Sequence, residues 1–547
     1  MSISLFNQFA LLLGITAVIG FIAVKLRQPL ILAFIIVGII AGPTGLGILA
    51  EHGQVEILAS FGITLLLFIV GLKLDIDSIK AFGPVVLLIG AGQMLLTAGL
   101  GSLLAYALGL KLIPAIVTGV AMAFSSTIII IKALSDREEM ESLFGRIAVG
   151  ILIVQDLVVV IAIIVLSSLS IETSLAQHWA WEALMLMLKG VGFLVVVAIL
   201  MRGILPTIIE HMAKSRELLV LFALAWAVLL SACAEKLGFG KEIGGFLAGV
   251  SLAPTHFRES IASRLDTVRN LLLVFFFINL GAALQFDTLV NNIIPALVLS
   301  LFVLLGKPLI VMTLMGVARF RQRTAFMTAV TMGQVSEFSL ILAALAHALG
   351  FIDAAAVGLI IFMSLITIGL STYMINYASE IYNTLAPWLL RFERAMHFRE
   401  DVHTKTHEHK IDVIVYGFGR HGEYLATLLE SKGLKTMGVD FDPRRVKPHH
   451  PHHMPIRYGD AEDAEFIKTL PLAEAKWVVS TIPHYDSNQI LISSLREIGY
   501  KGKIALSAFH ENEIELVKNL HVDMVFVPYQ DAALSAADQI VASARIK

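Results

Sequence analysis

Cysteine and charged residues are scarce in this sequence. Cys233 is the only cysteine in the 547 residues, and it lies in an apolar stretch. A single cysteine excludes an intramolecular disulfide and a cysteine-based metal site. Charged residues make up only 15% of the chain and hydrophobic residues 57%, with a mean hydropathy of +0.81. These values lie far outside the range of soluble proteins, so we expect a polytopic membrane protein.

A basic amino-terminal region is also missing. No basic residue precedes the first apolar stretch, which begins at Leu5, and no small-residue cleavage site precedes Lys25. A cleaved secretory signal carries both features. We therefore interpret this stretch as the first membrane span.

Thirteen apolar segments are candidates to cross about 30 Å of hydrocarbon. Lysine and arginine are concentrated in the loops after odd-numbered segments. Since cytoplasmic loops carry the excess of basic residues, we expect the amino terminus outside and the carboxyl terminus in the cytoplasm. The segments are approximately 5–24, 30–49, 56–72, 84–109, 113–134, 143–169, 183–203, 216–236, 242–254, 268–285, 291–317, 324–349 and 355–378.

The composition changes after the last apolar segment. From Arg391 the chain is charged and rich in histidine as far as about Lys410. Short apolar runs then alternate with stretches of helical period, which is typical of a parallel, doubly wound sheet. We predict a transmembrane exchanger domain at 1–380, a cytoplasmic linker at 381–410 and a Rossmann-like α/β domain at 411–547.

A carboxylic acid lies in the middle of the sixth segment. Asp156 follows Gln155 in a run that is otherwise apolar. An ionisable group at that depth costs at least about 2.5–3.5 kcal/mol, so it marks a functional site by default. A carboxylate in a water-accessible cavity binds an alkali cation or a proton, and both compete for the same oxygens. We therefore predict cation/proton exchange at Asp156; the alternative is an acid that only fixes helix packing.

Gln155 offers the cation an amide oxygen and no titrating group. With Asp156 as the only titrating acid, one proton replaces one monovalent cation and no net charge crosses the membrane. A second acid in place of Gln155 would allow two protons per cation. The pair predicts electroneutral exchange, and Gln155→Asp is the informative substitution.

Lys307, in the eleventh segment, is the candidate partner of Asp156. A nearby ammonium would keep the acid ionised and repel a cation from the empty site. The alternative is a lysine that snorkels to the membrane interface.

Two other segments carry polar residues at matching places. Ser125, Ser126 and Thr127 lie in the fifth segment, and Glu337 with Gln334 lies in the twelfth. In one interpretation the hydroxyls bind an ion together with backbone carbonyls of an unwound stretch. In the other, the hydroxyls only hold neighbouring helices together. Glu337 is a candidate second ion ligand, proton path or helix-end partner. Segments 1–6 and 8–13 would then be inverted halves joined by segment 7.

A glycine motif opens the carboxyl-terminal domain. The sequence Gly417-Phe-Gly419-Arg420-His-Gly422 follows an expected strand and begins an expected helix, and Asp440 ends the next strand. In this context the motif indicates a dinucleotide or adenine nucleotide, with phosphate at the helix start and Asp440 on a ribose hydroxyl. Asp460 closes the third strand at the same sheet edge. A fold that has lost its ligand is the alternative.

A histidine cluster, at positions 449, 450, 452 and 453, surrounds Pro451. Metal binding is one interpretation, and a solvated loop is the one we favour.

At these residues the sequence resembles the monovalent cation:proton antiporter-2 family, and its Kef-type potassium/proton branch with a TrkA-N (regulator of potassium conductance) type of domain. The matching stretches include Leu66 to Asp75, Ser125 to Thr127, Gln155-Asp156, Gly244 to Gly249 and Gly333 to Phe338. The resemblance implies an NhaA/NapA-like antiporter fold with inverted repeats, a homodimer and elevator-type alternating access. It also implies that AMP or NAD(H) in the soluble domain restrains transport.

Two departures from the family pattern affect regulation. Lys73 replaces the glutamate of the usual Gly-Leu-Glu-Leu, and the loop 258–266 is far less acidic than in glutathione-gated members. Control by glutathione does not follow from the resemblance, while an ancillary regulatory subunit does remain an expectation.

We therefore expect an inner-membrane antiporter, not an enzyme, that exchanges K⁺ for H⁺ across the lipid bilayer and has no nucleic-acid partner. The alternatives are a Na⁺/H⁺ antiporter, a nucleotide-gated cation channel and, last, a membrane-bound dehydrogenase. The channel lacks a glycine-rich filter, and the dehydrogenase lacks a catalytic acid/base set.

Overall fold

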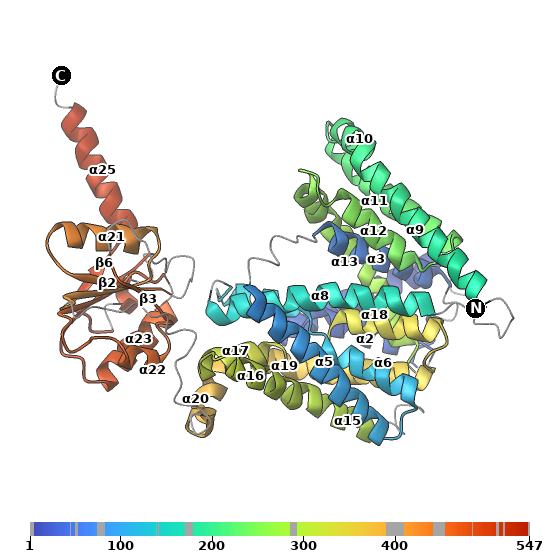
Figure 1. The fold of residues 1–547 in the computed structure, drawn as a ribbon, viewed down its shortest axis with the longest axis horizontal. Helices are drawn as coiled ribbons and strands as arrows, with labels where there is room; N and C mark the ends of the chain where they lie inside the picture. Colours follow the sequence, from blue (N-terminus) through green and yellow to red (C-terminus); the bar gives the residue numbers. More distant parts are fainter. Residues whose placement is uncertain are drawn as a thin grey trace. The chain divides into compact units, whose positions relative to one another are not determined.

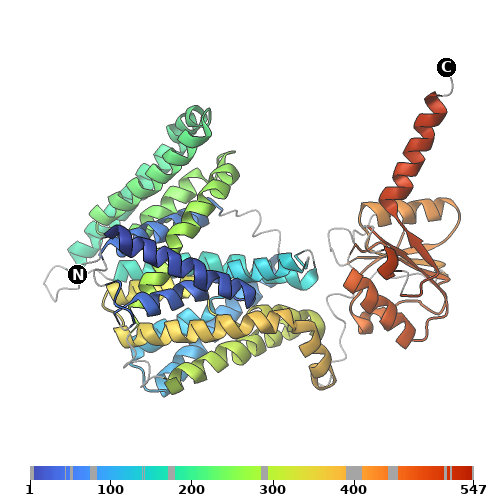
Figure 2. The same ribbon diagram turned by 180° about the vertical axis from the view of Figure 1, so that it is seen from behind.

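The computed structural model describes most of the chain (Figures 1 and 2). The described residues are 5–43, 45–49, 53–73, 83–137, 139–140, 142–169, 179–284, 293–389, 410–440, 454–483, 485–509, 514–517 and 520–544. Two compact units emerge. The first comprises Met1–Ala133, Ile147–Leu314 and Phe326–Leu385, and the second comprises Leu134–Arg146, Met315–Ala325 and Ala386–Lys547.

The first unit is built of apolar helices, and each of the thirteen predicted segments contains at least one of them. Within the described residues, nine helices, some of them interrupted, are long and apolar enough to cross a membrane. The helices are α1 (Leu5–Lys25), α2 (Leu30–Ala41), α3 (Gly53–Leu72), α5 (Gly83–Ala107), α6 (Leu112–Ala123), α7 (Thr127–Asp136), α8 (Leu143–Leu169), α9 (Trp179–Gly203), α10 (Leu205–Met212), α11 (Arg216–Lys236), α12 (Lys241–Leu252), α13 (Arg258–Ala282), α15 (Ile293–Leu301), α16 (Lys307–Val317), α17 (Gln322–Thr331), α18 (Glu337–Ala348), α19 (Ala354–Asn376) and α20 (Ala378–Leu389).

These helices form two packed groups. In Figure 1, α9 and α11 lie on one side of the unit, α5, α6, α15 and α16 on the other, and α8 and α18 between them. One apolar core joins side chains of α3 and α9–α13. A larger core joins α5, α6, α8, α15, α18 and α19; it also contains side chains of α2, α3 and α13, so α3 and α13 contribute to both cores. Large apolar side chains such as Leu88 and Leu95 are nevertheless exposed, at 70% and 76%. Faces that meet lipid must be apolar as well, which explains why these helices read as continuous apolar runs rather than as amphipathic stripes.

Two of the predicted segments are not continuous helices. The fifth is divided into α6 and α7 by residues 124–126, and the twelfth into α17 and α18 by residues 332–336. Ser336 caps α18, since its hydroxyl accepts a hydrogen bond from the Phe338 N–H. Small polar residues compete for backbone hydrogen bonds and favour such helix starts. Both interruptions lie where the sequence places its hydroxyl and glycine residues.

The second unit contains a six-stranded parallel sheet in the order β3-β2-β1-β4-β5-β6. The short apolar runs of the sequence form its strands, which are β1 (Val413–Tyr416), β2 (Thr436–Asp440), β3 (Ile456–Tyr458), β4 (Trp477–Ser480), β5 (Lys503–Ser507) and β6 (Met524–Phe526). The connecting helices are α21 (Arg420–Ser431), α22 (Ala464–Lys468), α23 (Tyr485–Glu497) and α25 (Pro528–Ala544).

Both faces of this sheet are covered by helices. Val413 and Val415 pack with α21 on one face, whereas Ile414 and Tyr416 pack with α22 and α23 on the other. Figure 1 shows α21 and α22 on opposite faces. Double coverage is the reason that β1 is buried at every residue.

The predicted linker, 381–410, begins within α20, and its residues 390–409 lie outside the described part of the chain. The histidine cluster at 449–453 also lies outside the described residues.

Candidate functional site

The two interrupted helices meet in the first unit. The Ser125 hydroxyl donates to the Met332 carbonyl at 3.2 Å, and the Ser339 hydroxyl donates to the Ala121 carbonyl at 2.6 Å. These bonds join residues 207 and 218 positions apart in the sequence. The crossing therefore brings the ends of four helices, whose last backbone groups have no partner within their own helix, into one buried place.

Asp156 lies on α8 beside this crossing. The Thr127 hydroxyl lies 3.1 Å from its Oδ1 and 3.2 Å from its Oδ2. Thr127 is the first residue of α7, so the positive end of that helix dipole stabilises negative charge at Asp156. Asp156 and Thr127 are only partly buried, whereas Gln155 and Ser126 are buried. Asp156 and Thr127 are thus the accessible side of the cluster, and Asp156 is its accessible acid.

Gln155 holds the backbone of the first interruption. Its Oε1 accepts from the Ser125 N–H at 2.9 Å, and its Nε2 donates to Gln93 Oε1 at 2.7 Å. Gln93, on α5, in turn donates to the Ala123 carbonyl at the end of α6, at 3.1 Å. The two amides fix each other, so Gln155 is directed at the crossing. Gln93 is a site residue that the sequence analysis missed; an amide in the middle of an apolar segment was the available signal.

Lys307 joins the two interruptions directly. Its Nζ donates to the Phe124 carbonyl at 2.7 Å and to the Gln334 carbonyl at 2.9 Å, and the side chain is fully buried. A π-helical turn, Phe302–Gly306, immediately precedes it. Such turns are frequent at functional sites. Within the described residues no ion pair joins Lys307 to Asp156.

Glu337 begins α18 at the second interruption and is 2% exposed. The Ser126 and Ser336 hydroxyls face its carboxyl, and it is near enough to Asp156 for their charges to interact. Glu337 Oε2 and Gln334 Nε2 are buried without a hydrogen-bond partner among the described residues. The structure thus gathers all seven predicted ion-site residues around one crossing.

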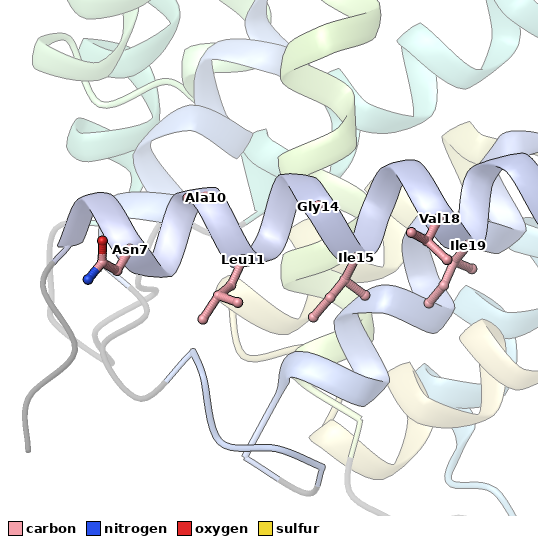
Figure 3. Close-up of a pocket in the computed structure, with 7 residues that line it drawn as sticks. All are labelled: Asn7, Ala10, Leu11, Gly14, Ile15, Val18 and Ile19. Carbon is pink, nitrogen blue, oxygen red and sulfur yellow. The ribbon is translucent and has the colours of Figure 1, made fainter.

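An open apolar groove of about 810 Å³ runs along α1 (Figure 3). Asn7 is the only polar side chain in its lining, with Leu11, Ile15 and Val18 among the apolar ones. Alkali cations need several oxygen ligands. This groove is therefore not the ion site.

The glycine motif of the second unit forms a tight turn between β1 and α21. Gly417 has a φ of +81°, and a Cβ at Gly422 would collide with the Gly417 carbonyl. Gly419 is the N-cap of α21 and contributes no side-chain cap, so the turn presents N–H groups of the kind that bind phosphate. Asp440 Oδ2 accepts from the Phe418 N–H at 2.6 Å. These residues fit a nucleotide phosphate and ribose; Arg420 is exposed at the helix start.

Asp460 lies at the carboxyl edge of the sheet, as the sequence analysis places it, but its contact is a basic side chain. Arg323 Nη1 lies 3.4 Å from Asp460 Oδ2 within the second unit. The role of Asp460 as a nucleotide ligand stays a prediction.

Comparison with known proteins decides the family. The model of the family described as sodium/hydrogen exchanger, transmembrane, matches residues 10–377, which is more than half of the chain. The chain belongs to this family. A TrkA-N domain, a nucleotide-binding type of domain, matches residues 413–528. The protein is therefore a multi-pass membrane cation/proton antiporter and not an enzyme.

Similar proteins cover most of the chain. The glutathione-regulated potassium-efflux system protein KefC of Escherichia fergusonii, and that of Escherichia coli K12, are each 29% identical over 90% of this chain and 77% of their own length. The sodium proton antiporter MjNhaP1 of Methanocaldococcus jannaschii is 20% identical, with a TM-score of 0.52 over 72% of this chain and 99% of its own. This last likeness supports the antiporter fold.

Proposed function

We propose that this sodium/hydrogen exchanger family member exchanges K⁺ for H⁺ at Asp156. The observation that supports it is one accessible carboxylate, held by Thr127 at the crossing of two interrupted helices. Partly desolvated carboxylate, hydroxyl and backbone carbonyl oxygens bind an alkali cation, and protonation of the acid releases it. K⁺ is favoured over Na⁺ because the similar Escherichia proteins are potassium-efflux proteins.

The exchange we propose is electroneutral, with one proton per cation. Gln155 cannot titrate, and both ends of its amide are held by Ser125 and Gln93. Glu337 is buried with one oxygen unpaired. An ionised carboxylate there would leave charge on a buried oxygen that has no hydrogen-bond partner, so we propose that Glu337 stays protonated through the cycle. Asp156 alone then changes its charge.

We expect the exchange rate in proteoliposomes to be independent of an imposed membrane potential. An internal pH dye would report proton movement after K⁺ or Na⁺ addition, at 0 mV and at a potential set by the gradient of a permeant ion other than K⁺, Na⁺ and H⁺. A rate that changed with potential at saturating cation would contradict one-to-one exchange. Cation flux without proton movement would favour the channel instead. To add a second acid at this position, Gln155→Glu is a closer match to the wild type than Gln155→Asp, because glutamate keeps the side-chain length that reaches Ser125 and Gln93.

Gln93→Leu is expected to raise the cation concentration for half-maximal exchange about tenfold, equivalent to about 1.4 kcal/mol. The change removes the acceptor of the Gln155 amide and the donor to the Ala123 carbonyl. The same dye assay over a series of K⁺ concentrations measures it. Because the two amides act as one unit, the double variant Gln93→Leu/Gln155→Leu should be no worse than the more damaged single variant. Additive losses would contradict this coupling.

The second unit is the proposed regulatory domain. AMP or NAD(H) would lie against the turn from Gly417 to Gly422, with Asp440 shaping that turn. A bound nucleotide supplies an anionic phosphate that the α21 N–H groups hold, and it shifts the balance between restrained and active states. Adding AMP or NADH to the proteoliposome assay tests this; an unchanged rate together with no binding would exclude nucleotide control.

The remaining features follow the family resemblance. We propose a homodimer in an inner membrane, with the amino terminus outside and the second unit in the cytoplasm. We also propose that α6, α7, α17 and α18 move as an elevator against the rest of the first unit.

A further inference from the structure

The second unit contains a buried cluster of charged side chains that the exchange site does not use. Asp460, Glu462 and Asp463 follow β3, at the carboxyl edge of the sheet. Arg137 and Glu139 come from the segment 134–146, and Arg321 and Arg323 from the segment 315–325, both of which belong to this unit. The side chains of Arg321 and Arg323 are only 6% and 11% exposed. Arginine is rarely buried unless it is paired.

Arg321 and Arg323 are paired with the acids of the sheet edge, whereas Arg137 pairs with Glu139 of its own segment at 3.1 Å and its charge acts on Glu462. Arg321 Nη1 lies 3.2 Å from Asp463 Oδ2. Arg323 contacts both Asp460, at 3.4 Å, and Glu462. Two residues of the cluster have further contacts in the same unit. Ser487 donates a hydrogen bond to Glu462 Oε1 at 2.6 Å, and the Arg321 guanidinium lies over the Phe466 ring at 5.4 Å. Bonds from both sides make this a specific surface rather than scattered surface charge.

The basic segments continue directly into the interrupted helices. Arg137 follows the last residue of α7, and α7 begins at Thr127, which holds Asp156. Arg323 is the second residue of α17, which ends at Thr331 beside the second interruption. A helix of ten residues is a stiff rod about 15 Å long, so holding one end limits movement at the other.

The acidic surface is also connected to the nucleotide motif. The Gly459 N–H donates to the Asp440 carbonyl at 3.1 Å, and the Asp440 carboxylate holds the Phe418 N–H of the glycine turn. A conformational change in the glycine turn is therefore transmitted to Asp460 through Asp440 and Gly459, which are hydrogen-bonded to each other.

We propose that Asp460, Glu462 and Asp463 form the docking surface by which the TrkA-N domain holds the adjoining ends of α7 and α17 and so restrains exchange. This inference rests on the proposed exchange at Asp156 for its transport readout. Alternating access requires the two interrupted helices to move, and the arginine contacts oppose that movement.

The docking surface is expected to loosen as pH rises. Burial raises the pKa of Glu139 to about 7, and burial together with Glu462 raises the pKa of Asp460 to about 6. Stabilisation by acids of raised pKa is complete below their ordinary values near 4 and is lost as pH rises through 6 to 7. Burial also acts to raise the pKa of Glu462, but Arg323 and the Ser487 hydrogen bond lower it, so this acid stays ionised in that window. The groups facing Glu139 and Asp460 are Arg137, Arg323, Glu462 and Asp463.

Charge reversal in the full-length protein tests the docking surface. Arg323→Glu and Asp463→Arg should each raise the exchange rate at pH 6 several-fold and flatten its dependence between pH 6 and 8. The double variant Arg321→Asp/Asp463→Arg, in which the two charges are swapped, should return the ion-exchange rate toward that of the wild type. Lys476→Glu is the matched control, because Lys476 pairs with Asp412 in the same domain but is 71% exposed. An unchanged or lowered rate in Arg323→Glu, with the control normal, would overturn the proposal.

Amide hydrogen exchange provides a readout that does not depend on transport. In detergent-solubilised protein, the amide hydrogens of segments 134–146 and 315–325 should exchange faster in Arg323→Glu than in the wild type. The charge-swapped double variant Arg321→Asp/Asp463→Arg should restore their protection. If wild-type proteoliposomes show no cation-driven proton movement while this protection pattern holds, the exchange proposal fails and the docking surface stands. Equal protection in all variants would exclude the surface itself.

Discussion

Asp156→Asn is expected to reduce K⁺-driven proton movement to the level of empty liposomes. Asparagine keeps the size of the side chain and an oxygen near Thr127, but it neither ionises nor binds a proton at neutral pH. Exchange requires one group that takes up either ion, and Asp156 is the accessible acid of the crossing. Without its charge the cation loses its only anionic ligand in the proposed site. An internal pH dye in proteoliposomes measures the loss.

A matched substitution separates loss of the exchange group from loss of folding. Asp353→Asn makes the same chemical change in the same unit, at the N-cap of α19, where Asp353 accepts the Ala356 N–H at 2.9 Å. Asparagine caps helices as well as aspartate does, so this variant should exchange ions like the wild type. Residual proton-coupled exchange in Asp156→Asn, above that of empty liposomes, would require another titrating group, and Glu337 would be the first to examine.

Lys307→Met is expected to lower both stability and transport. The change leaves the Phe124 and Gln334 carbonyls without the ammonium donor. Each buried group left unpaired costs about 1–3 kcal/mol, so we expect a loss of about 2–6 kcal/mol in the free energy of unfolding. Since about 1.4 kcal/mol is tenfold in rate, distortion of the crossing should slow exchange about tenfold or more. Thermal unfolding in detergent and the proteoliposome assay measure the two effects.

Lys241→Met is the control for this substitution. Lys241 pairs with Glu235, but both side chains are about half exposed at 47% and 57%, and such pairs contribute little. The melting temperature of Lys241→Met should match that of the wild type. A higher melting temperature in Lys307→Met would show that burying the ammonium costs more than its two hydrogen bonds return, and Lys307 would then be retained for transport alone.

Much of the fold can be read from local patterns. A helix inside a membrane must be apolar along its whole length, so the segments were visible as runs. A strand that is covered on both faces is also apolar throughout, which made β1 and β2 visible between turns. The polar positions Ser125 and Glu337 marked the interruptions, because such residues are costly in hydrocarbon unless the backbone around them needs partners.

The hydrogen-bond partners of the polar side chains were harder to predict from the sequence. Lys307 was expected to act on Asp156 as a charge, whereas the structure shows it bound to two carbonyls. Gln155 was expected to face the cation, whereas both ends of its amide are engaged at the crossing. An amide or ammonium can bond in several directions, and only the positions of neighbouring helices select one of them.

The sequence by itself determined that an acid, Asp156, lies in an apolar segment and that a glycine motif opens the carboxyl-terminal domain. These conclusions depend on residue type and spacing, which are local properties. Only the tertiary structure decided that Gln93 supports Gln155, that Lys307 joins residues 124 and 334, and that Arg321 and Arg323 meet the acids after β3. Those contacts join residues 27 to 183 positions apart, and their geometry exists only once the helices and the sheet have packed.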